Sequence, residues 1–231
     1  MKEFFEKHEA LITFGLIIIY IISNSMCMQN FGVADYRSVL VNFILTTAIC
    51  IFIKKSNLTE YFGLNKFPKA KEYLYFIPLV MMVSINLWNG VNLNNTIGYI
   101  ICHICAMIFV GFLEEIIFRG FLFKMMEKDG VKSAIIVSSI TFGIGHIINL
   151  FNGAEIVPTV MQIIQACSIG YLFVIIFYKS KSMWPCIITH AAINSLSVFN
   201  VESESLSYII TIFVVLVSLG YALYINKKIK E

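Results

Sequence analysis

Residues 111–120 read GFLEEIIFRG, and this stretch places charged side chains inside an otherwise apolar run. Glu114, Glu115 and Arg119 all fall within it. A charged side chain at the centre of a bilayer costs about 3 kcal/mol on insertion scales, so such residues face a protein interior or a water-filled cavity. The stretch therefore predicts a membrane helix that carries a functional site.

The composition of the rest of the chain is that of an integral membrane protein. Of 231 residues, 58% are hydrophobic and 13% are charged, and the mean hydropathy is +0.82. Soluble domains have an apolar share of about 45–50%. The formal net charge of +3 does not indicate a nucleic-acid partner, because the basic residues sit in short loops where membrane topology explains them. The lipid bilayer is the partner that the composition predicts, and the oligomeric state is left open.

Apolar stretches at eight places are near the ~20 residues that a helix needs to cross a membrane. They are residues 10–28, 38–53, 73–88, 96–123, 133–151, 157–178, 183–199 and 206–225. Acidic residues before the first stretch disfavour a cleavable signal peptide there, so we interpret it as a span. We therefore predict an all-α bundle of about eight transmembrane helices that forms one domain over residues 1–231.

The distribution of the basic residues predicts the orientation of these helices. On the map of eight spans every lysine falls on one side, Arg37 falls on the other, and Arg119 lies within a span. Cytoplasmic loops of membrane proteins carry the excess of Lys and Arg. Both termini are therefore predicted to be cytoplasmic.

The six cysteines lie in or beside apolar segments and lack the paired spacing of a disulfide scaffold. They are Cys27, Cys50, Cys102, Cys105, Cys167 and Cys186. We interpret them as small buried hydrophobic residues and predict no structural disulfide. Cys102, His103 and Cys105 form one short run without a second ligand pair, which disfavours a metal site there.

Three of the predicted helices each offer a polar face. Pairs of residues spaced i, i+4 share one side of a helix, and these pairs are Glu115 and Arg119, Phe142 and His146, and His190 and Asn194. Because unsatisfied polar groups in hydrocarbon cost several kcal/mol, the three faces are expected to meet inside the bundle. Small residues nearby would permit close helix approach; they are Gly111, Gly120, Gly143, Gly145, Ala191 and Ala192.

This set of side chains suits hydrolysis of a peptide bond. A carboxylate can take a proton from water, a histidine can hold that water directly or through a metal, and a second histidine with an amide can donate hydrogen bonds to an oxyanion. Other protease signatures are absent: there is no HExxH and no GxSG-like turn, and the only aspartates, Asp35 and Asp129, lie in predicted loops.

In this order, EEIIFR from Glu114, FGIGH from Phe142 and HAAIN from His190 resemble the three motifs of the CPBP family. These are the CAAX proteases and bacteriocin-processing enzymes, also called Abi. The resemblance covers roughly residues 111–196, which form the motif core. It implies an eight-helix intramembrane endopeptidase.

The resemblance also implies a role for each motif residue. Glu114 and His146 would activate water, and His190 and Asn194 would stabilise the oxyanion. Glu115, Arg119 and Phe142 would support the site. A divalent metal such as zinc remains open: the residues able to hold it would be Glu114, His146 and His190, but the site could also work without metal.

The expected substrate is a membrane-associated peptide or a lipidated protein. Bacterial members of the family include peptide-maturation and bacteriocin-immunity proteins, and the richness in Asn, Ile and Lys suits a low-GC Gram-positive bacterium. We therefore expect a multi-pass protein of a bacterial plasma membrane. The alternative is a non-proteolytic scaffold or immunity protein that retains the polar cluster for packing.

The depth of the polar residues predicts where cleavage occurs. At a rise of ~1.5 Å per residue, Glu114 lies ~15 Å from Lys124, His190 ~14 Å from Lys181 and His146 ~21 Å from Lys132. These depths place the site near the midplane of a hydrocarbon core ~30 Å thick. We expect the substrate to reach it from the cytoplasmic side or laterally.

Overall fold

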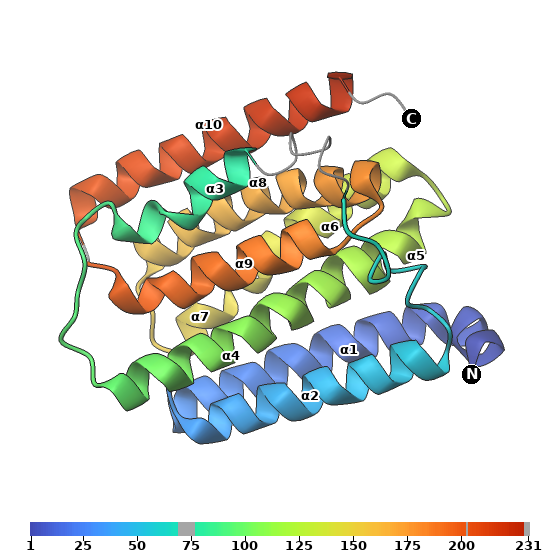
Figure 1. Cartoon of the computed structure of the whole chain (residues 1–231), viewed down its shortest axis with the longest axis horizontal. Helices are drawn as coiled ribbons and strands as arrows, with labels where there is room; N and C mark the ends of the chain where they lie inside the picture. Colours follow the sequence, from blue (N-terminus) through green and yellow to red (C-terminus); the bar gives the residue numbers. More distant parts are fainter. Residues whose placement is uncertain (69–76, 202, 229–231) are drawn as a thin grey trace.

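The computed structural model describes residues 1–68, 77–201 and 203–228, which form a helical bundle without strands in this part of the chain (Figure 1). Among the described residues, six helices are long and apolar enough to cross a membrane. They are Lys2–Asn30, Tyr36–Lys55, Ile97–Glu127, Val131–Phe151, Ile156–Ser180 and Leu206–Lys227. The all-α class and the multi-pass character predicted from the sequence are thereby confirmed.

Most of these spans correspond to a single named helix. The single helices are α1 (Lys2–Asn30), α2 (Tyr36–Lys55), α8 (Ile156–Ser180) and α10 (Glu204–Lys228). The span that carries the charged stretch runs through α4 (Ile97–Glu115), the π-helix η3 (Ile116–Phe123) and α5 (Lys124–Glu127). The fourth span consists of α6 (Val131–Gly145) and the short α7 (Ile148–Phe151).

The predicted count of eight spans is not confirmed, because two of the predicted spans form short helices. Residues 183–199 give α9 (Trp184–Leu196) and η4 (Ser197–Phe199). In the predicted span 73–88, residues 73–76 lie outside the described residues, and the remainder gives α3 (Ile77–Val83) and η2 (Ile85–Leu87). Each falls short of the ~20 residues that a straight membrane crossing needs.

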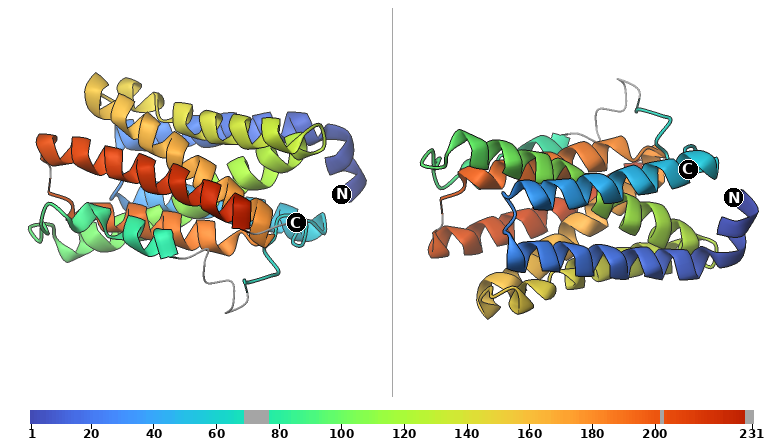
Figure 2. Two further views of the ribbon diagram at one scale, coloured as in Figure 1. Left: turned by 90° about the horizontal axis from the view of Figure 1, so that it is seen from above. Right: turned by 90° about the horizontal axis from the view of Figure 1, so that it is seen from below.

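The helices lie roughly side by side, with their connections at two ends of the bundle (Figures 1 and 2). The start of α1 and the last described turn of α10 lie at the same end, together with α5 and the end of α2. The turn that follows α1 and the turn that precedes α8 lie at the opposite end. We call the first the lysine-rich end, because three helices carry lysines there: α2 and α8 in their last turns and α5 at Lys124. We call the opposite end the lysine-poor end.

Two glycines let neighbouring helices approach closely. A Cβ atom added at Gly111 on α4 would lie 2.7 Å from the backbone N of Ala191 on α9, and one added at Gly143 on α6 would lie 2.2 Å from Sγ of Cys167 on α8. The sequence prediction of close approach is thus confirmed at these two positions. It is wrong for Gly145, where an added Cβ meets nothing within 4 Å.

The cysteines are free in the structure, and their exposure differs from the prediction. Cys27 and Cys186 are buried, Cys50 is exposed, and the other three are half-buried. The interpretation as small buried residues therefore holds for only two of them, because several sit on outer helix faces, which the apolar sequence alone does not distinguish from the core.

Candidate active site

A cavity of about 440 Å³ lies inside the bundle and receives side chains from α1, α2, α4, α6, α8 and α9. Of the predicted site residues, those on its wall are Glu114, Phe142, His146, His190 and Asn194. The other two, Glu115 and Arg119, are fully buried behind this wall, each with 0% exposure. The structure thus brings all three motifs to one place.

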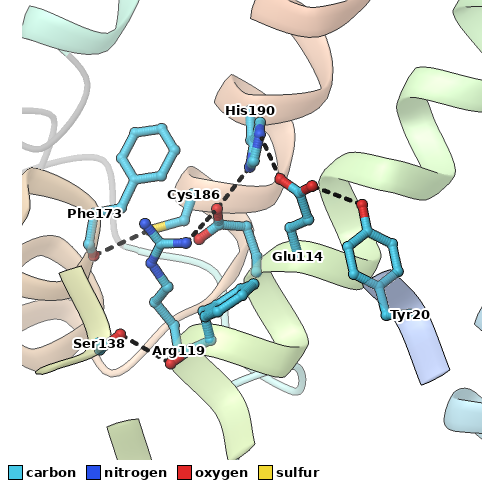
Figure 3. Close-up of polar contacts among 9 residues, drawn as sticks. Tyr20, Glu114, Arg119, Ser138, Phe173, Cys186 and His190 are labelled. Carbon is cyan, nitrogen blue, oxygen red and sulfur yellow. Dashed lines mark hydrogen bonds and ion pairs between the residues drawn. The ribbon is translucent and has the colours of Figure 1, made fainter. Parts of the chain in front are cut away.

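Two adjacent carboxylates on α4 meet one histidine on α9 (Figure 3). Nδ1 of His190 lies 2.7 Å from Oε1 of Glu115, and Nε2 of His190 lies 3.3 Å from Oε2 of Glu114. The close packing at Gly111 explains why α9 comes near enough for these contacts. His190 therefore bridges the two carboxylates, each of which faces a different ring nitrogen.

Arg119 completes the buried charge cluster. Its Nη1 donates to Oε1 of Glu115 at 3.1 Å, the i, i+4 pair that the sequence predicted. Its guanidinium carbon lies 4.1 Å from the ring centroid of Phe142, a cation–π distance. An added Cβ at Gly170 on α8 would lie 3.2 Å from Nη2 of Arg119, so this glycine leaves room for the guanidinium.

Phe142 links the second motif to the rest of the site. Its ring centroid lies 5.6 Å from the ring of His146 and 5.6 Å from the ring of His190, edge-on in both cases. His146 ends α6 and lines the cavity beside Phe142. The described part of the chain offers the His146 ring no hydrogen bond, so the ring is held by packing and faces the cavity.

Asn194 lines the cavity one helical turn after His190. His103 on α4 holds the helical turn of α9 that contains Asn194. Nε2 of His103 lies 3.1 Å from the backbone carbonyl oxygen of Asn194 and 3.1 Å from Oγ of Ser197. His103 also lines the cavity. His103, from the short run with Cys102 and Cys105, therefore anchors the end of α9.

The sequence reasoning missed one residue that touches the site. Oη of Tyr20 on α1 donates to Oε1 of Glu114 at 2.6 Å (Figure 3). Nδ2 of Asn24 donates to Oη of Tyr20 at 3.3 Å. A tyrosine and an asparagine spaced i, i+4 in the first span were a polar face of the same kind as the three motifs. Because both side chains are uncharged, they do not stand out from the apolar sequence of the span as Glu114, Glu115 and Arg119 do.

The backbone after the two glutamates is a π-helix, Ile116–Phe123. Its i→i+5 pattern shifts the carbonyl groups away from ordinary α-helical partners, and such turns are frequent at functional sites. One of these carbonyls, that of Phe118, accepts a hydrogen bond from Oγ of Ser138 on α6 at 2.9 Å. The π-helix therefore ties the charged stretch to α6 as well as to α9.

A divalent metal on Glu114, His146 and His190 stays a prediction. Within the described ranges no group of three or more His, Cys, Asp or Glu side chains is placed to hold a metal ion. His190 has each ring nitrogen beside a glutamate, and His146 packs edge-on against Phe142.

The cavity runs from Glu114 toward the lysine-poor end. Its wall includes Cys27 and Met28 near the end of α1, Val33 in the following turn, and Asn149 and Asn152 around α7. The approach expected from the sequence was from the lysine-rich side or laterally. The polar cavity instead extends in the opposite direction, because the lysine-rich half of α4 and η3 is fully packed.

Fold and site together define a multi-pass helical membrane protein with a buried glutamate–histidine–arginine cluster on an internal cavity. In comparisons with known proteins, residues 96–196 match the family described as "Type II CAAX prenyl endopeptidase Rce1-like". This segment contains all three motifs, and its match confirms the predicted resemblance to the CPBP family. No curated protein and no solved structure matched the chain.

Proposed function

We propose that this protein is an intramembrane endopeptidase that cleaves a membrane-associated peptide or lipidated protein with water activated by Glu114. The family relationship supports a CAAX-type intramembrane protease at the level of the family. The observation that carries the proposal for this chain is the contact of His190 with both Glu114 and Glu115 at the wall of the cavity.

The charges of the cluster balance when His190 is an imidazolium. Carboxylates only accept hydrogen bonds when ionised, and both ring nitrogens of His190 face carboxylate oxygens. Arg119 then compensates Glu115, and His190 compensates Glu114. A net neutral cluster suits a buried site, because an unpaired charge in such surroundings is strongly destabilising.

In the proposed reaction, Glu114 takes a proton from a water molecule in the cavity. Oε1 of Glu114 is held by Tyr20, whereas Oε2 has no hydrogen-bond partner in the described residues and is the oxygen that would receive the proton. The water oxygen forms a bond to the carbonyl carbon of the substrate, and the carbonyl oxygen becomes an oxyanion. Glu114 then gives the proton to the leaving amine as the peptide bond breaks.

The remaining motif residues would act on the water and the oxyanion. His146 lines the cavity without a hydrogen-bond partner for its ring in the described residues, which leaves it able to orient the water. Once Glu114 has taken the proton, Nε2 of His190 would turn from Oε2 of Glu114 to the oxyanion and donate a hydrogen bond to it. The amide of Asn194, one helical turn further along α9, would donate a second one. No step of this mechanism passes through a metal. Metal analysis of the purified protein tests the alternative of a divalent ion on Glu114, His146 and His190.

We further propose that the lysine-rich end faces the cytoplasm of a bacterium, with both termini on that side of the plasma membrane. The positive-inside rule supports this orientation. The short helices α3 and α9 would complete the eight membrane segments expected from the sequence, each in a broken or partial crossing that is tolerated where protein surrounds it.

Exchange of Glu114 for glutamine tests the proposed function. Glu114→Gln keeps the size of the side chain and removes the base, so we expect loss of processing by a factor of at least about 100. The measurement compares the membrane peptidomes of cells that carry wild type, Glu114→Gln, and the control Glu155→Gln, which changes an exposed glutamate before α8. A peptide present with wild type and with the control, and absent with Glu114→Gln, identifies both class and substrate.

The alternative function, a scaffold or immunity protein, makes the opposite prediction. Such a protein binds its partner through its surface and needs no proton acceptor. If bacteriocin immunity or another cellular phenotype is unchanged in Glu114→Gln and no peptide depends on Glu114, the protease proposal is wrong.

A further inference from the structure

Tyr20 lies in α1, outside the family-matched segment 96–196, yet its hydroxyl contacts the residue proposed as the base. The side chain is 5% exposed. At 2.6 Å, the contact between its Oη and Oε1 of Glu114 lies within the range of about 2.5–2.7 Å for hydrogen bonds from a hydroxyl to an ionised carboxylate. This contact spans 94 positions of the sequence.

The contact determines which oxygen of Glu114 faces the reaction. Tyr20 holds Oε1, and Oε2 is thereby turned toward His190, 3.3 Å from its Nε2. Without the hydroxyl, the carboxylate could rotate about its last bond, and Oε1 would lose its partner. Asn24 donates to the tyrosine oxygen and so fixes the direction of the phenolic hydrogen toward Glu114.

The ring of Tyr20 has a second neighbour. It lines the polar cavity and also an apolar groove of about 270 Å³ between α1, α2 and α4, whose wall is almost entirely aliphatic and aromatic. The ring is therefore a partition between the cavity and this groove. Phenylalanine at this position would keep the partition and remove only the hydroxyl.

We propose that Tyr20 is a positioning residue for the intramembrane reaction, whose hydroxyl fixes the carboxylate of Glu114 in the orientation that takes the proton from water. This inference rests on the proposed function. It adds α1 to the catalytic unit, although α1 lies outside the family-matched segment 96–196. A buried tyrosine hydroxyl usually has a hydrogen-bond partner, and the partner of Tyr20 is the residue proposed as the base.

The direct test is infrared spectroscopy of the purified full-length protein. The difference between wild type and Glu114→Gln isolates the carboxylate bands of Glu114, and the same difference is recorded in the Tyr20→Phe background. We expect the Glu114 bands to shift when the hydroxyl is removed. Tyr208→Phe on α10, an exposed tyrosine, is the matched control and should leave them unchanged. If the difference spectrum that Glu114→Gln produces is the same in the wild-type and Tyr20→Phe backgrounds, the inference is wrong.

The functional test uses the processed membrane peptide as readout. Tyr20→Phe should lower the processing rate about 10-fold or more, since small misplacements of a catalytic group have effects of this size. In the Glu114→Gln background, Tyr20→Phe should have no additional effect. An unchanged processing rate in Tyr20→Phe contradicts the positioning role. If wild type processes no peptide, the proposed function fails, whereas the infrared result still decides whether Tyr20 holds Glu114.

Discussion

At the scale of single residues, Glu115 is the centre of the site. One of its oxygens, Oε1, contacts both Nη1 of Arg119 and Nδ1 of His190. The pair with Arg119 followed from the i, i+4 spacing and is confirmed by the structure. The contact with His190 did not follow from any spacing, because the rotation of α9 about its axis is set by packing between helices rather than by local sequence.

Removal of either member of the buried pair should destabilise the protein. Glu115→Gln or Arg119→Met leaves an uncompensated buried charge, which costs about 3–5 kcal/mol, whereas the double variant should lose less than the sum of the two. The free energy of unfolding in detergent, measured for both single variants and the double variant, tests this. Additive effects would show that the two side chains do not stabilise each other.

At the scale of elements, the site depends on backbone contact between α4 and α9. Gly111 lies one turn before Glu114 and Glu115, and the nearest atoms to its absent side chain belong to Ala191, next to His190. The sequence predicted that small residues would permit such approach. It could not predict which helices pair, because the same small residues occur on several spans.

Alanine at Gly111 should therefore separate the two helices and impair the site. We expect Gly111→Ala to cost about 1–3 kcal/mol through overpacking and to reduce processing, because His190 moves with α9. Gly98→Ala is the matched control in the same helix, since an added Cβ there meets nothing within 4 Å. Thermal unfolding and peptide processing are compared for the two variants. Equal behaviour of Gly98→Ala and Gly111→Ala would disprove the proposed role of this contact.

At the scale of the whole molecule, charge marks one end of the bundle and the cavity extends toward the other. The end with the lysines was predictable, because short loops concentrate them and the chain alternates direction. The direction in which the cavity extends could not be predicted from the sequence. It depends on which half of the bundle interior is filled, and the aromatic and aliphatic side chains of η3, such as Phe121 and Phe123, fill the lysine-rich half.

Labelling of engineered cysteines at the two ends of the bundle tests whether the cavity opens at the end opposite to the lysines. In a chain whose native cysteines are replaced by alanine, Val33→Cys places a thiol on the cavity wall near the lysine-poor end. Lys132→Cys places one in the first turn of α6, which follows α5 at the lysine-rich end. A membrane-impermeant maleimide added to intact cells should label Val33→Cys and reduce processing. Lys132→Cys should react only after the membrane is opened. If both positions react in intact cells, the two ends of the bundle do not lie on opposite sides of the membrane, and the proposed arrangement is wrong.

The buried charge cluster also constrains the order in which this protein can be built. The ribosome releases the span that runs through α4 and η3, with its two glutamates and Arg119, before it has made His190, which follows Glu115 by 75 positions. Arg119 travels in the same helix as Glu115, so that pair can enter the bilayer already matched. Glu114 finds Tyr20 in a helix made earlier. During biogenesis, Tyr20 on α1 would thus give Glu114 a hydrogen-bond partner before α9, with His190, has been made.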